Sequence, residues 1–268
     1  MSEDSHVFND RQEAIVKLVE QTGFATVTEL ADRFDVTTQT IRRDVNALCI
    51  ACRLARFHGG VGLPNSTQNE EYSDRRTALI SSKDAIGRLV REIIPNHASL
   101  FMNIGTTTEA VAEHLVDHQS LRIVTNNLHI ADLFSRKTAF EVMMAGGTVR
   151  GSDGGVVGEA AIEFLSGFRL DFGIIGISGI DPDGSLLDFD YREVRAAKTI
   201  IANARKTILV ADHSKFGRAA MAKVAALEDI DILVTDKAVP SAFADIVHRS
   251  GVDVVAPPPT EMAGAAPI

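Results

Sequence analysis

The stretch from Val36 to Leu48, VTTQTIRRDVNAL, constrains most strongly what this chain can fold into. Ile41, Val45 and Leu48 recur at helical spacing, so the stretch predicts a helix with one buried face. Thr37 suits the N-cap position, because its hydroxyl can accept a first-turn backbone N–H. The face opposite these apolar residues carries side chains that can form hydrogen bonds with base edges and phosphates: Thr38, Gln39, Arg42, Arg43 and Asn46. Taken alone, this pattern also fits an ordinary surface helix with solvated arginines.

The sequence around this helix predicts a winged helix-turn-helix domain. A first helix is expected over Arg11–Thr22, ended by Gly23, and a second is capped by Thr26 or Thr28. With a tight turn before the third helix, this is the helix-turn-helix layout. Arg53–Val61, RLARFHGGV, predicts a short hairpin, or wing. A structural domain with no DNA role is the alternative. The candidate DNA-binding residues are Thr38, Gln39, Thr40, Arg42, Arg43, Asn46, Arg56 and His58.

Composition narrows the class of protein. The net charge of −9 argues against non-specific coating of nucleic acid, which needs a basic surface, but allows a local basic patch. Met1–Asp10 is polar and acidic, unlike a secretory signal, and no apolar run has the length of a membrane span. Cys49 and Cys52 have no second cysteine pair nearby, so zinc is not expected. These features indicate a cytoplasmic protein with reduced thiols and no metal, cofactor or membrane partner.

The rest of the chain predicts an α/β domain. Residues 62–76 are polar and are expected to be a linker after a first domain over 1–61. Over 77–255, apolar strands alternate with helices, including one at Glu193–Ala204, which indicates a mainly parallel sheet. The Pro-rich tail, 256–268, is expected to be disordered. Strands are expected at Ser99–Ile104, Leu121–Thr125, Glu141–Ala145, Leu170–Ile177, Thr207–Ala211, Ile232–Thr235 and Val252–Val255.

Polar loops follow these strands, at the edge where such sheets bind ligands. In IGTTTE, Gly105 lets the backbone approach a ligand, and the threonines open a helix N-terminus, which suits an anion. Lys215 is a second candidate phosphate contact. Each of these features also has a purely structural explanation. In it the threonines only cap the helix, Lys215 is only solvated, and Asp181 and Asp183 only form an Asp-Pro-Asp-Gly turn. The candidate inducer-binding residues are Gly105, Thr106, Thr107, Thr108, Asn126, Asn127, Gly147, Asp181, Asp183, Glu193 and Lys215.

Two classes of function fit these features. Several polar strand ends together suit a small polyol or sugar phosphate, so the chain is either a repressor that senses such a metabolite or a sugar-phosphate isomerase. An isomerase would need a general acid and base, for which Asp181, Glu193 and Lys198 are candidates. No Ser-His-Asp order or metal-ligand spacing stands out. The predicted DNA-contacting helix favours the repressor, because an isomerase has no need of it.

The motifs also resemble a known family. VTTQTIRRDVNAL followed by FHGG, the IGTTTE loop, the TNN strand end and AGG are similar to DeoR-type repressors. FRLDFGIIGISGI, DGSLLDFDY, EVR and DHSKFGR resemble the members that control glycerol use, and the resemblance covers Arg11 to Val255. It implies a repressor of glycerol and glycerol 3-phosphate utilisation genes that binds operator double-stranded DNA. It further implies release by sn-glycerol 3-phosphate and a homo-oligomer, with a tetramer expected.

The resemblance extends to an enzyme fold. The C-terminal domain of the family is similar to ribose-5-phosphate isomerase. In that kinship the IGTTTE loop matches the phosphate loop, Asp181 and Glu193 lie near catalytic carboxylates, and Lys215 matches a ligand-contacting lysine. The glycine-rich segment with the enzyme's catalytic lysine is not evident, which implies no enzyme activity. Two departures from the family are Thr37-Thr38 in place of Ser-Pro, and the turn over Cys49–Cys52 in place of a more polar one.

Overall fold

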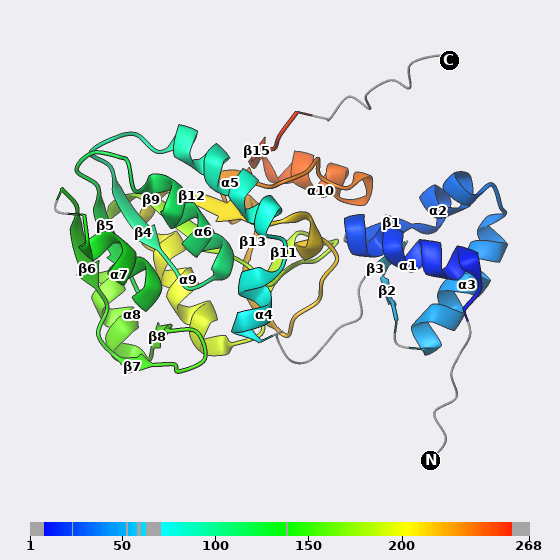
Figure 1. Cartoon of the computed structure of the whole chain (residues 1–268), viewed down its shortest axis with the longest axis horizontal. Coiled ribbons are helices and arrows are strands. Elements are labelled where there is room, and N and C mark those ends of the chain that lie inside the picture. The colour runs from blue at the N-terminus through cyan, green and yellow to red at the C-terminus, as the bar shows by residue number, and fades with distance from the viewer. Residues whose placement is uncertain are drawn as a thin grey trace.

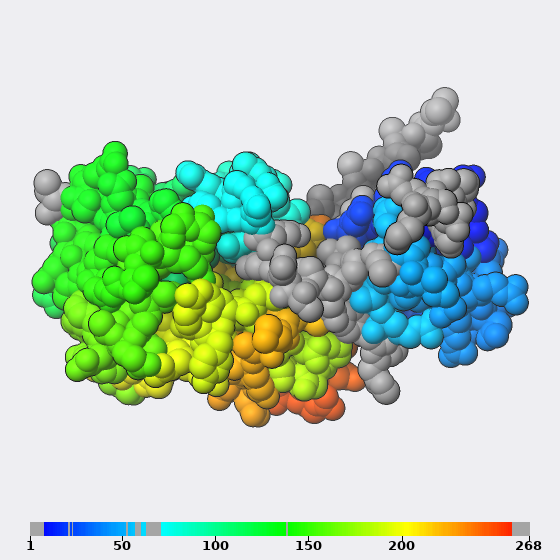
Figure 2. Space-filling view, turned by 90° about the horizontal axis from the view of Figure 1, so that it is seen from below, coloured from blue at the N-terminus to red at the C-terminus, as the bar shows by residue number. Residues whose placement is uncertain are grey.

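The computed structural model describes residues 8–22, 24–51, 53–57, 60–62, 71–137 and 139–258. They form an N-terminal domain and a larger C-terminal domain that lie side by side along the long axis (Figures 1 and 2). The candidate residue His58 and most of the expected linker and tail lie outside the described residues. The N-terminal domain consists of α1 (Asp10–Thr22), β1 (Phe24–Thr26), α2 (Val27–Phe34), α3 (Thr38–Ile50), β2 (Ala55–Phe57) and β3 (Gly60–Gly62).

Local hydrogen bonds define the helix-turn-helix. The Thr26 hydroxyl accepts from the Glu29 N–H at 3.1 Å, while the Glu29 carboxylate accepts from the Thr26 N–H at 2.8 Å, a capping box at the start of α2. Asp35, with φ 50°, ends α2 in the left-handed region. The Thr37 hydroxyl then caps α3 by accepting from the Thr40 N–H at 3.2 Å. The predicted helix-turn-helix is therefore confirmed, and β1, β3 and β2 pair in that order as its antiparallel wing sheet.

The C-terminal domain is built on a parallel sheet, as the sequence predicts. Within the described residues, seven strands pair in the order β15-β14-β12-β9-β4-β5-β6, and every pair is parallel. The chain builds β4, β5 and β6 towards one edge and then returns to add β9, β12, β14 and β15 on the other side of β4. The strands are β4 (Ser99–Met102), β5 (Arg122–Thr125), β6 (Glu141–Met144), β9 (Leu170–Gly176), β12 (Ala204–Val210), β14 (Ile232–Val234) and β15 (Asp253–Val255).

Helices cover both faces of this sheet. Successive strand residues point to opposite sides, and apolar residues on both sides have to be buried. Leu100 and Met102 of β4 are buried in one core, and Phe101 between them is buried in the other. The first core includes side chains of α5 (Ile80–Ile93), α6 (Thr106–Leu115) and α7 (Leu128–Ser135). The second includes side chains of α8 (Glu159–Ser166), α9 (Tyr191–Asn203) and α10 (Ser241–Ser250).

Several elements were not expected from the sequence. Tyr72–Thr77 forms a short helix, α4, within the stretch expected to be a linker. The Asp-Pro-Asp-Gly turn joins two strands of a small antiparallel sheet ordered β10-β11-β13. The remaining elements are β7 (Thr148–Val149), β8 (Val156–Val157), β10 (Gly179–Ile180), β11 (Ser185–Asp188), β13 (Ala222–Ala226) and the 3-10 turns η1 (His213–Lys215) and η2 (Leu227–Asp229).

Phe24 of β1 joins the two domains. It is 4% exposed and belongs to the core of the C-terminal domain, where its ring meets Phe243 edge-to-face with centroids 5.7 Å apart. Phe216 packs against the same Phe243 at 5.1 Å. Next to Phe216, Gly217 has φ 74°, and a Cβ there would lie 2.9 Å from the Phe24 ring. The junction is therefore a close aromatic contact, supported by a hydrogen bond from Ser241 to Glu29.

Candidate functional site

The outer face of α3 is open to solvent. Ile41, Val45 and Leu48 are fully buried on the inner face, which places the polar residues outward. The Arg56 guanidinium on β2 donates to the Arg42 carbonyl, with an Nη2–O distance of 3.4 Å, so a wing arginine lies beside the helix. The predicted DNA-binding residues that the structure brings together on this face are Thr38, Gln39, Thr40, Arg42, Arg43, Asn46 and Arg56.

The structure separates the acid of α3 from this face. Asp44 is 5% exposed and accepts from Arg11 Nε at 2.7 Å and from Gln12 Nε2 at 3.2 Å. Its negative charge is therefore compensated from α1 on the inner side. The outer face keeps Arg42 and Arg43 without an acidic neighbour from their own helix, which suits contact with DNA phosphates.

A polar cavity opens where the sheet reverses its strand order, between the carboxyl ends of β4 and β9. This is the point at which open parallel sheets bind ligands. Residues that follow β4 form one wall of the cavity, and residues that follow β9 form another. The remaining walls come from α4, α9 and the segment after β12. The lining residues are Arg75, Ile104, Gly105, Thr106, Thr107, Gly176, Ile177, Ser178, Asp188, Glu193, Lys215 and Arg218.

The loop between β4 and α6 presents backbone N–H groups to the cavity. Gly105, at φ 151°, precedes the first turn of α6, and Thr106 and Thr107 line the cavity. The Thr108 hydroxyl instead donates to the carbonyls of Asn103 at 3.0 Å and Gly105 at 2.7 Å, and its side chain is fully buried. Thr108 thus closes the loop, while the free N–H groups of the ten-residue helix offer an anion site.

Three cationic side chains line the same cavity. Lys215 Nζ lies 3.8 Å from Asp212 Oδ2, and its side chain is 17% exposed. Arg218 stacks over the Phe189 ring at 5.1 Å and donates to the Ser178 carbonyl at 3.4 Å. Arg75, on α4, is the third. Together they give the cavity the positive charge that a phosphate group requires.

Two carboxylates face these cations. Asp188 is buried and accepts from the Ser178 hydroxyl at 2.9 Å, and burial raises its pKa. Burial, followed by the nearby charge of Asp188, raises the pKa of Glu193 to about 7, although Arg150 lies 2.5 Å from it and opposes the shift. Carboxyl groups of this kind can accept hydrogen bonds from the hydroxyls of a polyol. The lining therefore combines groups for a phosphate with groups for hydroxyls.

The other candidate residues lie outside this cavity. Asn127 caps α7 by accepting from the His129 N–H at 2.9 Å, and Asn126 is fully buried, donating to the Val156 carbonyl at 3.1 Å. Both amides hold neighbouring loops in place. Gly147 packs against the backbone of Val157. Asp181 and Asp183 belong to the turn between β10 and β11, where the Asp183 side chain accepts from the Ser185 N–H at 2.8 Å.

The sequence reasoning missed four polar residues of the cavity: Arg75, Ser178, Asp188 and Arg218. Asp188 and Arg218 lie within motifs that the family resemblance already quoted, DGSLLDFDY and DHSKFGR, so that resemblance was a usable signal. Ser178 also lies within a quoted motif, FRLDFGIIGISGI, two residues after the strand that ends at Gly176. For Arg75 no such signal exists, because it lies in the polar stretch before the α/β pattern begins.

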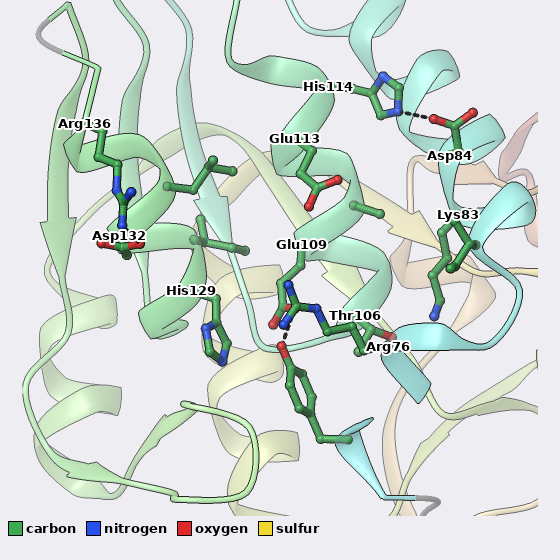
Figure 3. A pocket seen from close by; sticks show the side chains of 15 residues that line it. Arg76, Lys83, Asp84, Thr106, Glu109, Glu113, His114, His129, Asp132 and Arg136 are labelled. Carbon is green, nitrogen blue, oxygen red and sulfur yellow. Dashed lines mark hydrogen bonds and ion pairs between the residues drawn. The ribbon is translucent and has the colours of Figure 1, made fainter. Parts of the chain in front are cut away.

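A second, larger cavity of about 480 Å³ lies on the outer side of α6 (Figure 3). Its walls carry cations and acids together, including Arg76, Lys83, Glu109 and Asp132. His114 forms a hydrogen bond of 2.8 Å to Asp84 across one end. The acids of this cavity outnumber its lysine and arginine side chains, so it does not favour an anion: the acids are Asp84, Glu109, Glu113 and Asp132, and the cations are Arg76, Lys83 and Arg136. No set of three potential metal ligands occurs among the described residues, and no helix among them has the length and apolarity to cross a membrane.

A helix-turn-helix domain joined to a parallel α/β domain with a polar cavity defines the class of two-domain transcriptional regulators. Residues 11–67 match the family model of the DeoR-like helix-turn-helix domain, and residues 79–237 match that of the DeoR C terminal sensor domain. The chain belongs to the DeoR family. This assignment confirms the predicted regulator and excludes the isomerase reading, because the family consists of transcriptional repressors.

The chain is similar over most of its length to two curated repressors. It is 48% identical to the glycerol-3-phosphate regulon repressor of Escherichia coli over 237 residues, which cover 88% of this chain and 94% of that protein. It is 51% identical to the protein of the same name from Haemophilus influenzae over 225 residues, covering 84% and 88%. Among solved structures, ribose 5 phosphate isomerase A from Neisseria gonorrhoeae matches with a TM-score of 0.37 and 15% identity, covering 51% of this chain and 52% of that one.

Proposed function

We propose that the chain represses genes for the use of glycerol and glycerol 3-phosphate, and that sn-glycerol 3-phosphate releases it from operator DNA. It acts in the cytoplasm as a homo-oligomer, with a tetramer as the expected assembly. The relatives that share about half of its residues bear the name glycerol-3-phosphate regulon repressor, which supports this choice of regulon.

The observation that carries the proposal is the lining of the cavity at the switch point. A helix N-terminus and the side chain of Lys215 offer a site for a phosphate, while Asp188 and Glu193 offer acceptors for hydroxyl groups. The inducer has both parts, a phosphate at one end and two hydroxyls beyond it. An apolar metabolite would leave these groups without partners, which costs binding free energy.

Release from DNA follows from a difference in affinity between two states. The inducer binds better to the state in which the helix-turn-helix domains are misplaced for the operator, so its binding shifts the population away from the DNA-bound state. Linking several subunits strengthens the DNA contact, since one small domain binds DNA weakly. A modest change in domain placement then weakens all linked contacts together.

A gel-shift experiment tests this function. Promoter fragments of the glycerol utilisation genes are incubated with the full chain, and sn-glycerol 3-phosphate, glycerol, ribose 5-phosphate or inorganic phosphate is added. We expect specific binding that glycerol 3-phosphate alone reverses. Release by ribose 5-phosphate instead would show that the chain is a repressor with a different inducer. An absence of binding to these promoters would refute the proposed regulon. Light scattering after gel filtration measures the number of subunits.

A further inference from the structure

The short helix α4 is fastened to the C-terminal domain beside the ligand cavity. The Tyr72 hydroxyl donates to Glu109 at 2.7 Å, and its ring stacks on His129 with centroids 5.5 Å apart and an interplanar angle of 9°. Glu109, labelled in Figure 3, lies in the first turn of α6, the helix whose N-terminus lines the ligand cavity. The start of α4 is therefore tied to the phosphate-binding helix.

The end of α4 is held by a buried lysine. Lys83 of α5 is 6% exposed, and its ammonium group donates to the carbonyls of Ala78, at 2.8 Å, and of Arg75. Burying an ammonium group is costly unless hydrogen bonds replace its water, so these carbonyls are strongly preferred partners. Both ends of α4 are thus attached to helices of the C-terminal domain, α6 and α5, and Arg75 lines the cavity with Thr106 and Lys215.

One ion pair of Arg75, with Asp153, is long. Its guanidinium Nη2 lies 3.9 Å from Asp153 Oδ2, whereas Arg150 Nε donates to the same carboxylate at 2.8 Å. Arg150 also pairs with Asp190 at 2.6 Å. Asp153 is therefore held mainly by Arg150, and the guanidinium of Arg75 is of the kind that binds a doubly charged phosphate well.

The cavity has little free space, about 40 Å³, which is on the order of three water molecules. A phosphorylated ligand can enter only if lining side chains move. Lys215 and Arg218 flank Phe216, which is buried in the core at 1% exposure. Arg75 instead lies on α4, a helix of six residues none of which is buried. In Figure 2 the cyan surface, to which α4 belongs, lies on the side of the green part that faces the blue N-terminal domain.

We propose that Arg75 binds the phosphate of the inducer directly and that α4 thereby carries the state of the cavity towards the DNA-binding domain. The inference rests on the proposed function for the class of ligand. Arg75, Lys215 and the N-terminus of α6 form three sides of one anion site. α4 is the first described element after β3 of the wing, so a shift of Arg75 onto the phosphate displaces the part of the sensor domain that follows the helix-turn-helix domain in the sequence.

Calorimetric titration with sn-glycerol 3-phosphate tests the contact, using the full chain and the variants Arg75→Ala, Arg75→Lys and Arg76→Ala. Arg76 is the matched control, because it is the next residue of α4 and lines the other cavity. We expect Arg75→Ala to lose about ten- to a hundredfold in affinity, as for a charge-assisted hydrogen bond. Arg75→Lys should recover part of this loss, and Arg76→Ala should bind within about twofold of the parent. Thermal unfolding shows that each variant is folded.

The outcomes separate this inference from the proposed function. If the parent binds glycerol 3-phosphate and Arg75→Ala binds it equally well, the role of Arg75 is refuted, and glycerol 3-phosphate remains the proposed inducer. If the parent binds only another sugar phosphate, and Arg75→Ala loses that binding, glycerol 3-phosphate is refuted as the inducer, and the role of Arg75 is supported. A parent that binds no phosphorylated metabolite refutes both. At a saturating concentration of ligand, Arg75→Ala should remain bound to its promoter fragment in a gel-shift. If the ligand releases this variant from the fragment as fully as it releases the parent, the role of α4 in carrying the signal is refuted.

Discussion

Arg11 on α1 and Asp44 on α3 form an ion pair of 2.7 Å that turns the only acid of α3 into the N-terminal domain. Residues 33 positions apart in the chain thus meet on the buried side of α3. The consequence lies on the other side, where Arg42 and Arg43 are exposed without a neighbouring carboxylate from the same helix. The first prediction concerns these two arginines.

Replacing Arg42 or Arg43 by alanine should weaken operator binding and leave folding and inducer binding unchanged. An arginine that contacts a base is worth about 1–3 kcal/mol, so we expect a tenfold or greater loss in affinity and a weaker preference for sequence. A gel-shift titration measures the loss, with Arg91→Ala on α5 as a control for charge alone. Parent-like affinity in both variants would exclude α3 as the DNA-contacting helix.

Substitutions at the start of α6 should disable induction without affecting repression. Thr106→Asp places a negative charge where the phosphate is expected, so it should nearly abolish binding of glycerol 3-phosphate, and Thr107→Ala should weaken it. Both variants should bind the operator and no longer respond to inducer. Calorimetry and gel-shifts on the same preparations test this, with Thr148→Asp as the exposed control. Tight inducer binding by Thr106→Asp would place the phosphate elsewhere.

Inducer affinity should fall as the pH rises through 7. Burial and Asp188 raise the pKa of Glu193 to about 7, so Glu193 is neutral below that pH and negative above it. Its negative form repels the phosphate, whose second pKa is about 6, and binding therefore favours protonated Glu193. Between pH 6.5 and 8.5 we expect a loss of up to about tenfold per unit, as for one linked proton.

Glu193→Gln, neutral at every pH, should flatten this profile and bind more tightly than the parent at pH 8.5. Calorimetry in buffers of different ionisation enthalpy also measures the proton taken up on binding. Glu163→Gln, an exposed position on α8, is the control. An unchanged slope in Glu193→Gln would assign the pH dependence to another group.

Phe24→Ala should loosen the contact between the domains while both remain folded. Phe24 packs in the core of the sensor domain and is not part of the core of its own domain, so the helix-turn-helix should survive its loss. We expect normal inducer binding, reduced release from DNA at saturating inducer, and a free energy of unfolding lower by about 3–5 kcal/mol. Phe34→Ala, at a partly buried position packed against the N-terminal core, is the control for loss of an aromatic side chain. Release equal to the parent's would show that this contact does not transmit the signal.

Elements with a strong periodic pattern could be predicted from the sequence. Ile41, Val45 and Leu48 define the inner face of α3, and the short apolar run at Leu170–Gly176, one of several that alternate with helical patterns, indicates a strand covered on both faces. α4 could not be predicted in this way. None of its six residues is buried, and Tyr72 orders it through contacts with Glu109 and His129, far away in the chain.

The lining of the polar cavity at the switch point could be predicted only in part, for a related reason. The loop at Gly105–Thr107 follows a strand whose carboxyl end lies at the switch point, so the topology places it correctly. Asn127 and Asp183 occupy similar positions in the sequence, after strands, but their side chains satisfy backbone N–H groups nearby. Sequence spacing cannot separate a polar side chain that caps its own loop from one that faces a cavity, because both follow a strand directly.

The aromatic contact at Phe24 limits how freely the two domains can be exchanged between relatives. A sensor domain produced alone would expose the face of Phe243 that Phe24 covers, and a hydrophobic patch of that kind promotes self-association. A foreign helix-turn-helix domain would need an aromatic residue in the place of Phe24. The sensor domain would need a glycine opposite it, as at Gly217. Chimaeric repressors built from this family should therefore respond to inducer only when both sides of this contact come from compatible parents.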